Sequence, residues 1–132
     1  MNICIIDDDE IFQFATQRLI EITLGDQVGI HICEDGEEAI TYLRETDEKD
    51  FPDIIFLDIN MPKMNGFEFL LAYVNEELYE KKAVKIYVVS SSVDPQDIQH
   101  AKSHPYVSEY VKKPINKEKI FKIAEEFNSE TT

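Results

Sequence analysis

The sequence predicts an α/β fold in which helices cover both faces of one parallel, five-stranded sheet. Three observations predict this class. Short, continuous apolar runs alternate five times with segments whose apolar residues recur at helical spacing. Continuous apolar runs are typical of parallel strands, because such strands are buried on both faces. Acidic, hydroxyl or lysine residues follow several of these runs, as expected at the ligand-binding edge of such a sheet.

The first two strand–helix units lie in the N-terminal part of the chain. Residues 2–6 are predicted to form a buried strand, which an acidic cluster ends before a helix over 10–23. Residues 28–33 are predicted to form the second strand, and an Asp-Gly turn leads into a helix over 36–46. The core-facing residues expected on these two helices are Ile11, Ala15, Leu19 and Ile22 on the first, and Ala39, Ile40 and Leu43 on the second.

The third unit begins after Pro52. Residues 53–57 are predicted to form a strand, and the Pro- and Gly-containing segment 61–66 is predicted to form a loop. A helix follows that loop. The core-facing residues expected on it are Phe67, Leu70, Leu71 and Val74.

The last two units have clear helix starts. A strand over 84–89 precedes a helix over 95–103, and an Asp-Pro pair supplies the N-cap and first-turn residues of that helix. A strand over 107–111 precedes a final helix over 116–127, which its first residue, an asparagine, is expected to cap. The core-facing residues expected on the final helix are Ile120, Ile123, Ala124 and Phe127.

These units combine into a flavodoxin-like, doubly wound sheet with strand order 2-1-3-4-5. We expect residues 1–132 to form a single domain, with residues 128–132 as a frayed tail. In this order the first and third strands are neighbours. Asp7, Asp8 and Asp58, which follow those strands, should therefore converge at the point where the strand order reverses.

Composition narrows the class of protein. The formal net charge is −14, which argues against direct nucleic-acid binding, since that binding depends on Lys and Arg. No apolar run approaches the roughly 20 residues of a membrane helix, and the N-terminus lacks the basic region of a signal peptide. Cys4 and Cys33 lie in apolar strand-like segments, which favours reduced core thiols over a disulfide or a metal site. A cytoplasmic protein without membrane insertion is expected.

Asp58 is the predicted nucleophile of the site. A carboxylate can attack phosphorus to give an acyl phosphate. Several carboxylates gathered at one sheet edge repel one another unless a cation lies among them, and Mg²⁺ prefers oxygen ligands. We expect Asp8, Asp58 and the backbone carbonyl of Asn60 to bind Mg²⁺ directly, with Asp7 contributing through a bound water.

A lysine and a serine complete the predicted site. Lys113, at the end of the fifth strand, would form an ion pair with Asp58 or a phosphoryl oxygen, and Ser90 would donate its hydroxyl to the phosphoryl group. Each residue has a structural alternative. Asp9 fits a helix N-cap better than its two neighbours do, a Lys-Pro pair is often a surface turn, and a serine after a strand is often a turn residue. The coincidence of all these groups at four strand ends favours the functional interpretation.

The chain resembles the receiver domain of bacterial two-component response regulators, of the stand-alone, CheY-like kind, over essentially its whole length. The matching motifs are Ile6-Asp7-Asp8, the segment from Asp53 to Pro62 with Asn65-Gly66, Val88-Val89-Ser90-Ser91, and Tyr110-Val111-Lys112-Lys113-Pro114. The resemblance implies that Lys113-Pro114 is a cis peptide bond. It also implies a signalling protein that assists its own phosphorylation and dephosphorylation rather than an enzyme.

The resemblance also implies partners and a switch. A histidine kinase or a histidine phosphotransfer protein would supply the phosphoryl group to Asp58 with Mg²⁺ bound. Ser90 would move toward the phosphate and Tyr110 would swing inward, which remodels the face formed by the fourth helix, fifth strand and fifth helix. Tyr110 could instead be a static, half-buried aromatic residue of the strand.

Local departures from the family pattern concern the switch. Ser90 stands where Thr is commoner, and Ser91 stands where Ala is common, so a larger side chain lies beside the phosphoryl site. In the family, the residues two positions after the phosphoacceptor and two after the switch tune dephosphorylation. Here they are Asn60 and Ser92.

We expect no output domain after the fifth helix, and we therefore expect the output to be contact with an unknown protein target or onward phosphotransfer. Phe12 and Phe14 lie off the predicted core stripe of the first helix, beside the acidic pocket. Phe12 is predicted either to dock on the helical bundle of a kinase or to pack under the loop after the third strand.

Three competing functions remain open from the sequence. The first is an interaction module with the same fold that no longer uses phosphorylation, which the complete set of site residues argues against. The second is an aspartyl phosphatase of the haloacid dehalogenase type, which expects an Asp at position 60, where this chain has Asn60. The third is a flavodoxin, whose phosphate-binding loop the acidic cluster after the first strand would repel.

Overall fold

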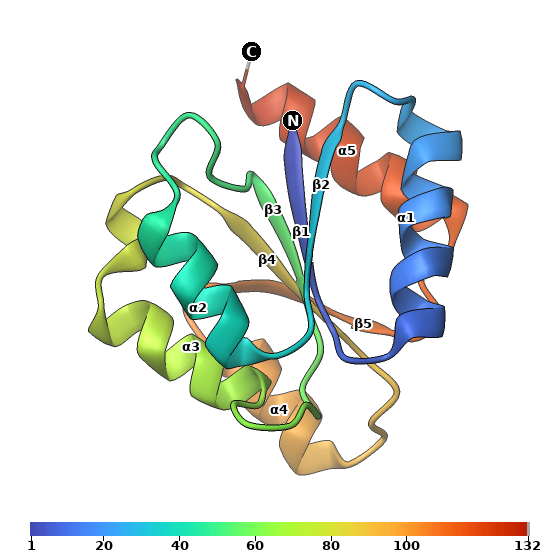
Figure 1. The fold of residues 1–132 in the computed structure, drawn as a ribbon. Coiled ribbons are helices and arrows are strands. Elements are labelled where there is room, and N and C mark those ends of the chain that lie inside the picture. Colours follow the sequence, from blue (N-terminus) through green and yellow to red (C-terminus); the bar gives the residue numbers. More distant parts are fainter. Residues whose placement is uncertain (132) are drawn as a thin grey trace.

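The computed structural model describes residues 1–131, which form one parallel sheet with helices on both faces (Figure 1). The strands are β1 (Asn2–Ile6), β2 (Gly29–Cys33), β3 (Ile54–Leu57), β4 (Lys85–Ser90) and β5 (Val107–Lys112). The helices are α1 (Glu10–Leu24), α2 (Gly36–Glu45), α3 (Gly66–Asn75), α4 (Pro95–Ser103) and α5 (Lys117–Thr131), with a short 3-10 helix η1 (Leu78–Glu80) after α3. The strand order is β2-β1-β3-β4-β5, which confirms the predicted flavodoxin-like topology.

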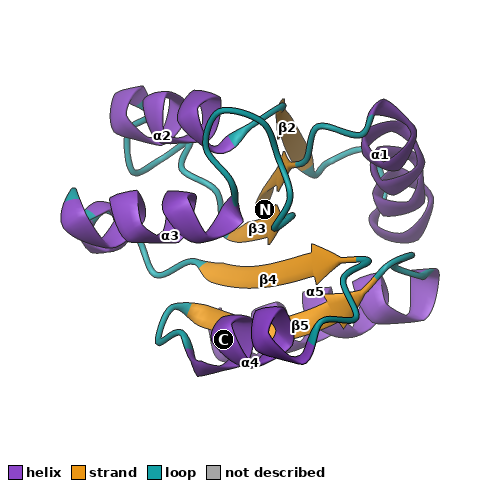
Figure 2. Cartoon of the chain, turned by 90° about the horizontal axis from the view of Figure 1, so that it is seen from below, coloured by secondary structure: helices purple, strands orange, loops and turns teal. Residues whose placement is uncertain are grey.

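The strands divide the core into two layers. Alternate residues of a strand point to opposite faces, so Cys4 and Ile6 of β1 pack on one side and Ile3 and Ile5 on the other. The first side is covered by α2, α3 and α4, and the second by α1 and α5, as both views of the chain show (Figures 1 and 2). Because both faces are covered, the central strands are buried and mostly apolar, and β3 is apolar at every position; this is the pattern from which the parallel sheet was predicted.

Polar caps fix the start of each helix at the carboxyl edge of the sheet. Asp9 accepts hydrogen bonds from two backbone N–H groups of α1, and Asp35 and Asp94 do the same for α2 and α4 with one N–H group each. Asn65 forms a reciprocal capping box at α3, and Asn116 accepts a hydrogen bond from the N–H of the residue three positions later. The predicted caps of α1, α4 and α5 are confirmed.

The predicted core stripe of α1 is wrong at Ile11, Ala15 and Ile22, which are exposed, and is confirmed at Leu19, which packs against the core. Ile11 is 81% exposed and Ile22 is 63% exposed, whereas Thr16 and Ile20 are buried. The real stripe lies one residue further along, which rotates it by about 100°. Because apolar residues occur on nearly every side of this helix, its spacing alone did not determine which side packs on the sheet. On α3 the same ambiguity leaves Leu71 exposed, while the buried residues are Gly66, Phe69, Leu70 and Tyr73.

Other boundaries agree closely with the prediction, with one exception. Each strand lies within one residue of its expected bounds, and Ala39, Ile40 and Leu43 of α2 are buried as expected. Helix α5 continues to Thr131, so residues 128–131 are helical rather than a frayed tail, and position 132 lies outside the described residues. Cys4 and Cys33 are buried, free thiols. In the described part of the chain no helix is both long enough and apolar enough to span a membrane.

Candidate functional site

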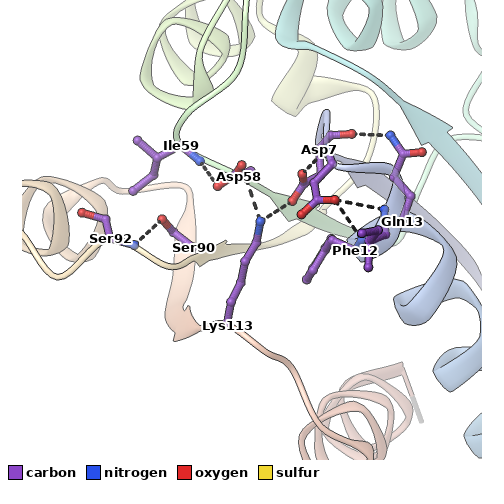
Figure 3. A network of polar contacts seen from close by, with 10 residues as sticks. Asp7, Phe12, Gln13, Asp58, Ile59, Ser90, Ser92 and Lys113 are labelled. Atoms are coloured by element: carbon purple, nitrogen blue, oxygen red, sulfur yellow. Dashed lines mark hydrogen bonds and ion pairs between the residues drawn. The ribbon is translucent and has the colours of Figure 1, made fainter.

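The carboxyl ends of four strands bring the predicted site residues together (Figure 3). Ile6 of β1 is paired with Leu57 of β3, so the next residues, Asp7 and Asp58, enter the same pocket. The N–H of Asp58 donates to the carbonyl of Ile6 at 3.0 Å, which holds the ends of β1 and β3 in register. The sheet thus places two carboxylates side by side through its backbone pairing alone.

Lys113 enters the pocket from the end of β5. Its backbone N–H donates to the carbonyl of Ser90 at 2.9 Å, and the Lys113-Pro114 peptide bond is cis, as predicted. The Lys113 Nζ atom lies 2.8 Å from Asp7 Oδ2 and 3.6 Å from Asp58 Oδ2. The sequence predicted an ion pair with Asp58, and the structure adds a shorter one with Asp7. One ammonium group is therefore shared by two carboxylates whose side chains are 1% and 9% exposed.

Burial, together with the neighbouring charges, shifts the pKa values of all three groups. Burial, followed by the charge of Asp7, raises the pKa of Asp58 to about 6, and the Lys113 ammonium only partly opposes this. Burial also raises the pKa of Asp7, against the hydrogen bonds and positive charge around it. Burial works against the charge on Lys113, but the neighbouring Asp7 and Asp58 carboxylates outweigh it and raise the lysine pKa. The pocket therefore holds more negative charge than a single lysine neutralises.

The excess negative charge fits a divalent cation. Ligand oxygens of Asp7, Asp8 and Asp58 all lie within 4.8 Å of one another. Asp7 Oδ2 is buried and accepts no hydrogen bond of good geometry, so it has only the Lys113 ion pair. Asp8 is exposed and can turn its carboxylate toward a hydrated ion, and Asn60 is exposed on the adjacent loop. This donor set consists of oxygens alone, which is the set that Mg²⁺ prefers.

Ser90 lies on the other side of Asp58 and is completely buried. Its Oγ atom accepts a hydrogen bond from the N–H of Ser92 at 3.1 Å, so its own hydrogen can be donated to an oxygen in the pocket. Ser92 also accepts a hydrogen bond from the Tyr110 hydroxyl at its carbonyl, at 2.6 Å, and donates its own hydroxyl to Asp97 of α4 at 2.7 Å. Ser92 therefore connects Ser90 and Tyr110 through its backbone and α4 through its hydroxyl, a role that the sequence did not predict.

Three further residues support the site through contacts that were not predicted. The Gln13 amide donates to the carbonyl of Asp7 at 2.5 Å, and the ring of Phe12 lies 4.4 Å from Lys113 Nζ. Gly66 begins α3 directly behind the phosphoacceptor loop, where a Cβ atom would come within 2.4 Å of the Asp58 carbonyl oxygen. The Asn-Gly pair was the available signal for Gly66, whereas the other two contacts depend on side-chain directions that spacing does not determine.

Comparison with known proteins identifies the family. The model of the response regulator receiver domain matches residues 3–125. The chain belongs to this receiver family. The predicted family resemblance is thereby confirmed, and the dehalogenase and flavodoxin alternatives are set aside. Receiver domains act as signalling proteins rather than classical enzymes, and they generally bind Mg²⁺ at an acidic pocket.

Individual relatives agree with this assignment. A two-component response regulator from Cytophaga hutchinsonii is 30% identical, with a TM-score of 0.84, over 97% of this chain and 96% of that one. The probable methanogenesis regulatory protein FilR2 of Methanothrix harundinacea is 29% identical over 94% of this chain and 79% of that protein. The transcriptional regulatory protein DegU of Brevibacillus brevis is 35% identical over 76% of this chain, which corresponds to only 39% of DegU.

Proposed function

We propose that Asp58 accepts a phosphoryl group from a phosphohistidine of a histidine kinase or a histidine phosphotransfer protein. The observation that carries this proposal is the position of the Asp58 carboxylate. Its side chain is 9% exposed, lies 3.6 Å from the Lys113 ammonium and shares a candidate cation site with Asp7 and Asp8. A lysine on one side of the carboxylate and a cation site on the other form the arrangement that phosphoryl transfer requires.

The transfer exchanges one bond to phosphorus for another. A carboxylate oxygen of Asp58 forms the new O–P bond while the P–N bond of the donor breaks, and its electron pair returns to the imidazole ring. Asp58 Oδ1 accepts a hydrogen bond from the N–H of Ile59 at 2.8 Å, which fixes the direction of the carboxylate. Because the pKa of Asp58 is about 6, the side chain is mostly ionised at neutral pH and can act as the nucleophile.

Two side chains act on the transferred group. Lys113 contacts a phosphoryl oxygen after turning from Asp7, and Ser90 donates its hydroxyl to another oxygen. Asp7, Asp8, Asp58 and the Asn60 carbonyl would hold Mg²⁺, which when bound would supply positive charge opposite the phosphoryl group. The roles of Asp7 and Lys113 are coupled, because each is the closest charged partner of the other before the reaction.

The output is a change of the α4-β5-α5 face. When Ser90 turns to the phosphoryl group, the hydrogen bond to Ser92 is strained, and the Ser92 carbonyl that holds Tyr110 moves with it. Tyr110 and α4 are therefore two elements that a local charge change can reposition for a protein partner or for onward transfer. We propose that this signalling takes place in the cytoplasm, without direct nucleic-acid binding.

The test is an intact-mass measurement. The protein is incubated with Mg²⁺ and either acetyl phosphate or phosphoramidate, in parallel with Asp58→Asn and with an EDTA control. The proposal expects the mass of one phosphoryl group on the wild type, and none in Asp58→Asn or with EDTA. An adduct that survives in Asp58→Asn would contradict the assignment, and no adduct despite Mg²⁺ binding and fluoroberyllate binding would exclude transfer from small donors.

A further inference from the structure

Phe12 lies against the site although it carries no acid, base or hydroxyl group. Its ring centroid is 4.4 Å from Lys113 Nζ, well inside the roughly 6 Å over which an aromatic face attracts a cation. The ring is half-buried and packs against the core layer under α1 and α5. Figure 3 shows Phe12 and Lys113 side by side in the same network as Asp7 and Asp58.

The start of α1 fixes the position of this ring. Asp9 accepts a hydrogen bond from the N–H of Phe12 at 3.4 Å and from the N–H of Ile11 at 2.9 Å, which sets the first turn of the helix. The N–H of Asp9 in turn donates to Asp7 Oδ1 at 2.9 Å. The acidic residue that pairs with Lys113 and the aromatic residue that covers it therefore belong to one hydrogen-bonded segment.

The Lys113 ammonium has three neighbours, Asp7, Asp58 and Phe12, which constrain its orientation to different degrees. Asp7 Oδ2 forms an ion pair with Lys113 Nζ at 2.8 Å without a well-aligned hydrogen bond, and Asp58 Oδ2 at 3.6 Å is too distant for a hydrogen bond. The face of an aromatic ring attracts the cation without demanding a particular N–H direction. A third carboxylate at the position of the ring would instead hold the lysine in place and repel an incoming phosphoryl group.

We infer that Phe12 is a positioning residue for phosphoryl transfer, whose ring keeps the Lys113 ammonium in the pocket while it turns from Asp7 to a phosphoryl oxygen. This inference rests on the proposed function of Asp58. It is distinct from both earlier predictions for Phe12, docking on a kinase and packing under the loop after β3, because it concerns the ring's contact with Lys113. The outward-facing aromatic residue of this helix is Phe14, which is 68% exposed.

The test compares variants that keep or remove the ring at nearly constant bulk. Phe12→Leu removes the aromatic face, Phe12→Tyr keeps it, and Phe14→Leu is the matched control on the same helix. Phosphorylation by phosphoramidate with Mg²⁺ is expected to slow about twofold to thirtyfold in Phe12→Leu, to stay near wild type in Phe12→Tyr and to be unchanged in Phe14→Leu. Phenylalanine analogues with increasing ring fluorination at position 12 should slow the reaction stepwise, because fluorine withdraws charge from the face of the ring.

Two readouts do not depend on transfer activity. The Lys113 side-chain protons should show a ring-current shift by NMR in the wild type and Phe12→Tyr, and should lose it in Phe12→Leu. Fluoroberyllate affinity should fall in the same order as the rates. Docking on a kinase makes a different prediction, since it would slow transfer from the kinase while leaving the small donor unaffected.

The outcomes separate the two proposals. A wild type that gains no phosphoryl group and binds neither Mg²⁺ nor fluoroberyllate overturns the proposed function itself. A wild type that is phosphorylated, together with wild-type rates in Phe12→Leu or a flat fluorination series, overturns the role of Phe12 alone. Equal losses in Phe12→Leu and Phe12→Tyr would show that Phe12 contributes packing rather than its aromatic face, and would also overturn the inference.

Discussion

Two lysine–aspartate pairs lie at opposite ends of the sheet with the same separation. Lys82 Nζ is 2.8 Å from Asp53 Oδ1 at the amino ends of the strands, and Lys113 Nζ is 2.8 Å from Asp7 Oδ2 at the carboxyl ends. At the amino edge, one lysine meets one carboxylate, whose other oxygen accepts the N–H of Asn2 at 2.8 Å. Lys82 also donates to the carbonyl of Phe51, which leaves this pair satisfied and structural.

The carboxyl edge differs in the number of charges rather than in distance. Lys113 is shared by Asp7 and Asp58, with Asp8 within reach of the same cation position. The negative charge exceeds the positive charge, and burial prevents water from compensating fully. The two pairs have the same length, so the distance does not distinguish them. The pair with balanced charges stabilises the fold, and the pair with excess negative charge belongs to the reactive site.

Replacing each lysine in turn should give the largest difference in effect between the two pairs. We expect Lys113→Met to reduce phosphorylation of Asp58 by about 100-fold or more, because the preorganised charge opposite the phosphoryl group is lost. Lys82→Met should leave that rate unchanged and lower the free energy of unfolding by about 1–2 kcal/mol, because Asp53 then keeps a partly buried, unpaired charge. Phosphoramidate kinetics and urea denaturation measure both effects, and a comparable loss of rate in Lys82→Met would abolish the distinction.

Neutralising Asp58 and neutralising Asp53 should change the free energy of unfolding in opposite directions. The pKa of Asp58 rises from 3.8 to about 6 on folding, so its charged form is disfavoured in the folded state. Stability from this group is fully present below pH 3.8 and is lost as the pH rises through about 6. Without metal, Asp58→Asn should therefore stabilise the protein at pH 7.5 on the order of 2 kcal/mol, and progressively less toward pH 4.

The matched variant is Asp53→Asn, which removes a balanced charge and should destabilise the protein at pH 7.5 by about 1 kcal/mol. Urea denaturation in EDTA across this pH range measures both variants. A destabilised Asp58→Asn protein at pH 7.5 would show that the charge at the carboxyl edge is already balanced without a cation.

Mg²⁺ should stabilise the folded protein only by binding at the carboxyl edge of the sheet. At tenfold excess over its dissociation constant, an ion that binds the folded state alone adds about 1.4 kcal/mol to the free energy of unfolding. Asp8→Asn should abolish this increase, whereas Asp53→Asn should retain it. Thermal melts with and without Mg²⁺ provide the measurement, and an undiminished increase in Asp8→Asn would place the ion elsewhere.

Ser92→Ala should give the smallest effect, because it alters the switch side of the site without touching a charge. Loss of the hydrogen bond to Asp97 should lower the free energy of unfolding by about 0.5–1.5 kcal/mol, while phosphorylation continues. NMR signals of α4 should then respond less to fluoroberyllate, whereas the Tyr110 ring, held by the Ser92 backbone carbonyl, should keep its response. A wild-type response of α4 would show that the Ser92 hydroxyl does not connect the site to that helix.

Much of this structure was predictable from the sequence. The order of the strands, most element bounds and the convergence of Asp7, Asp58, Ser90 and Lys113 follow from apolar periodicity and from the rule that parallel strand ends share an edge. Apolar strands buried on both faces leave little choice of register, and polar caps mark where the helices begin.

The remaining features depend on packing that no local pattern encodes. The α1 stripe was misplaced because that helix has apolar residues on several sides, and only contact with the sheet selects Thr16 and Ile20. Lys113 pairs most closely with Asp7 because of the path of its long side chain, and Phe12 and Ser92 enter the network through residues distant in sequence. Such contacts are set by tertiary geometry, so spacing along the chain does not predict them.

The most direct test of the central claim is to locate the phosphoryl group on the chain. The protein is phosphorylated with Mg²⁺ and phosphoramidate and then treated with borohydride, which reduces an aspartyl phosphate to homoserine. Peptide sequencing by mass spectrometry should find homoserine at position 58 and at no other aspartate. Homoserine at Asp7, Asp8 or Asp53, or at no position in protein that had gained a phosphoryl group, would contradict the account.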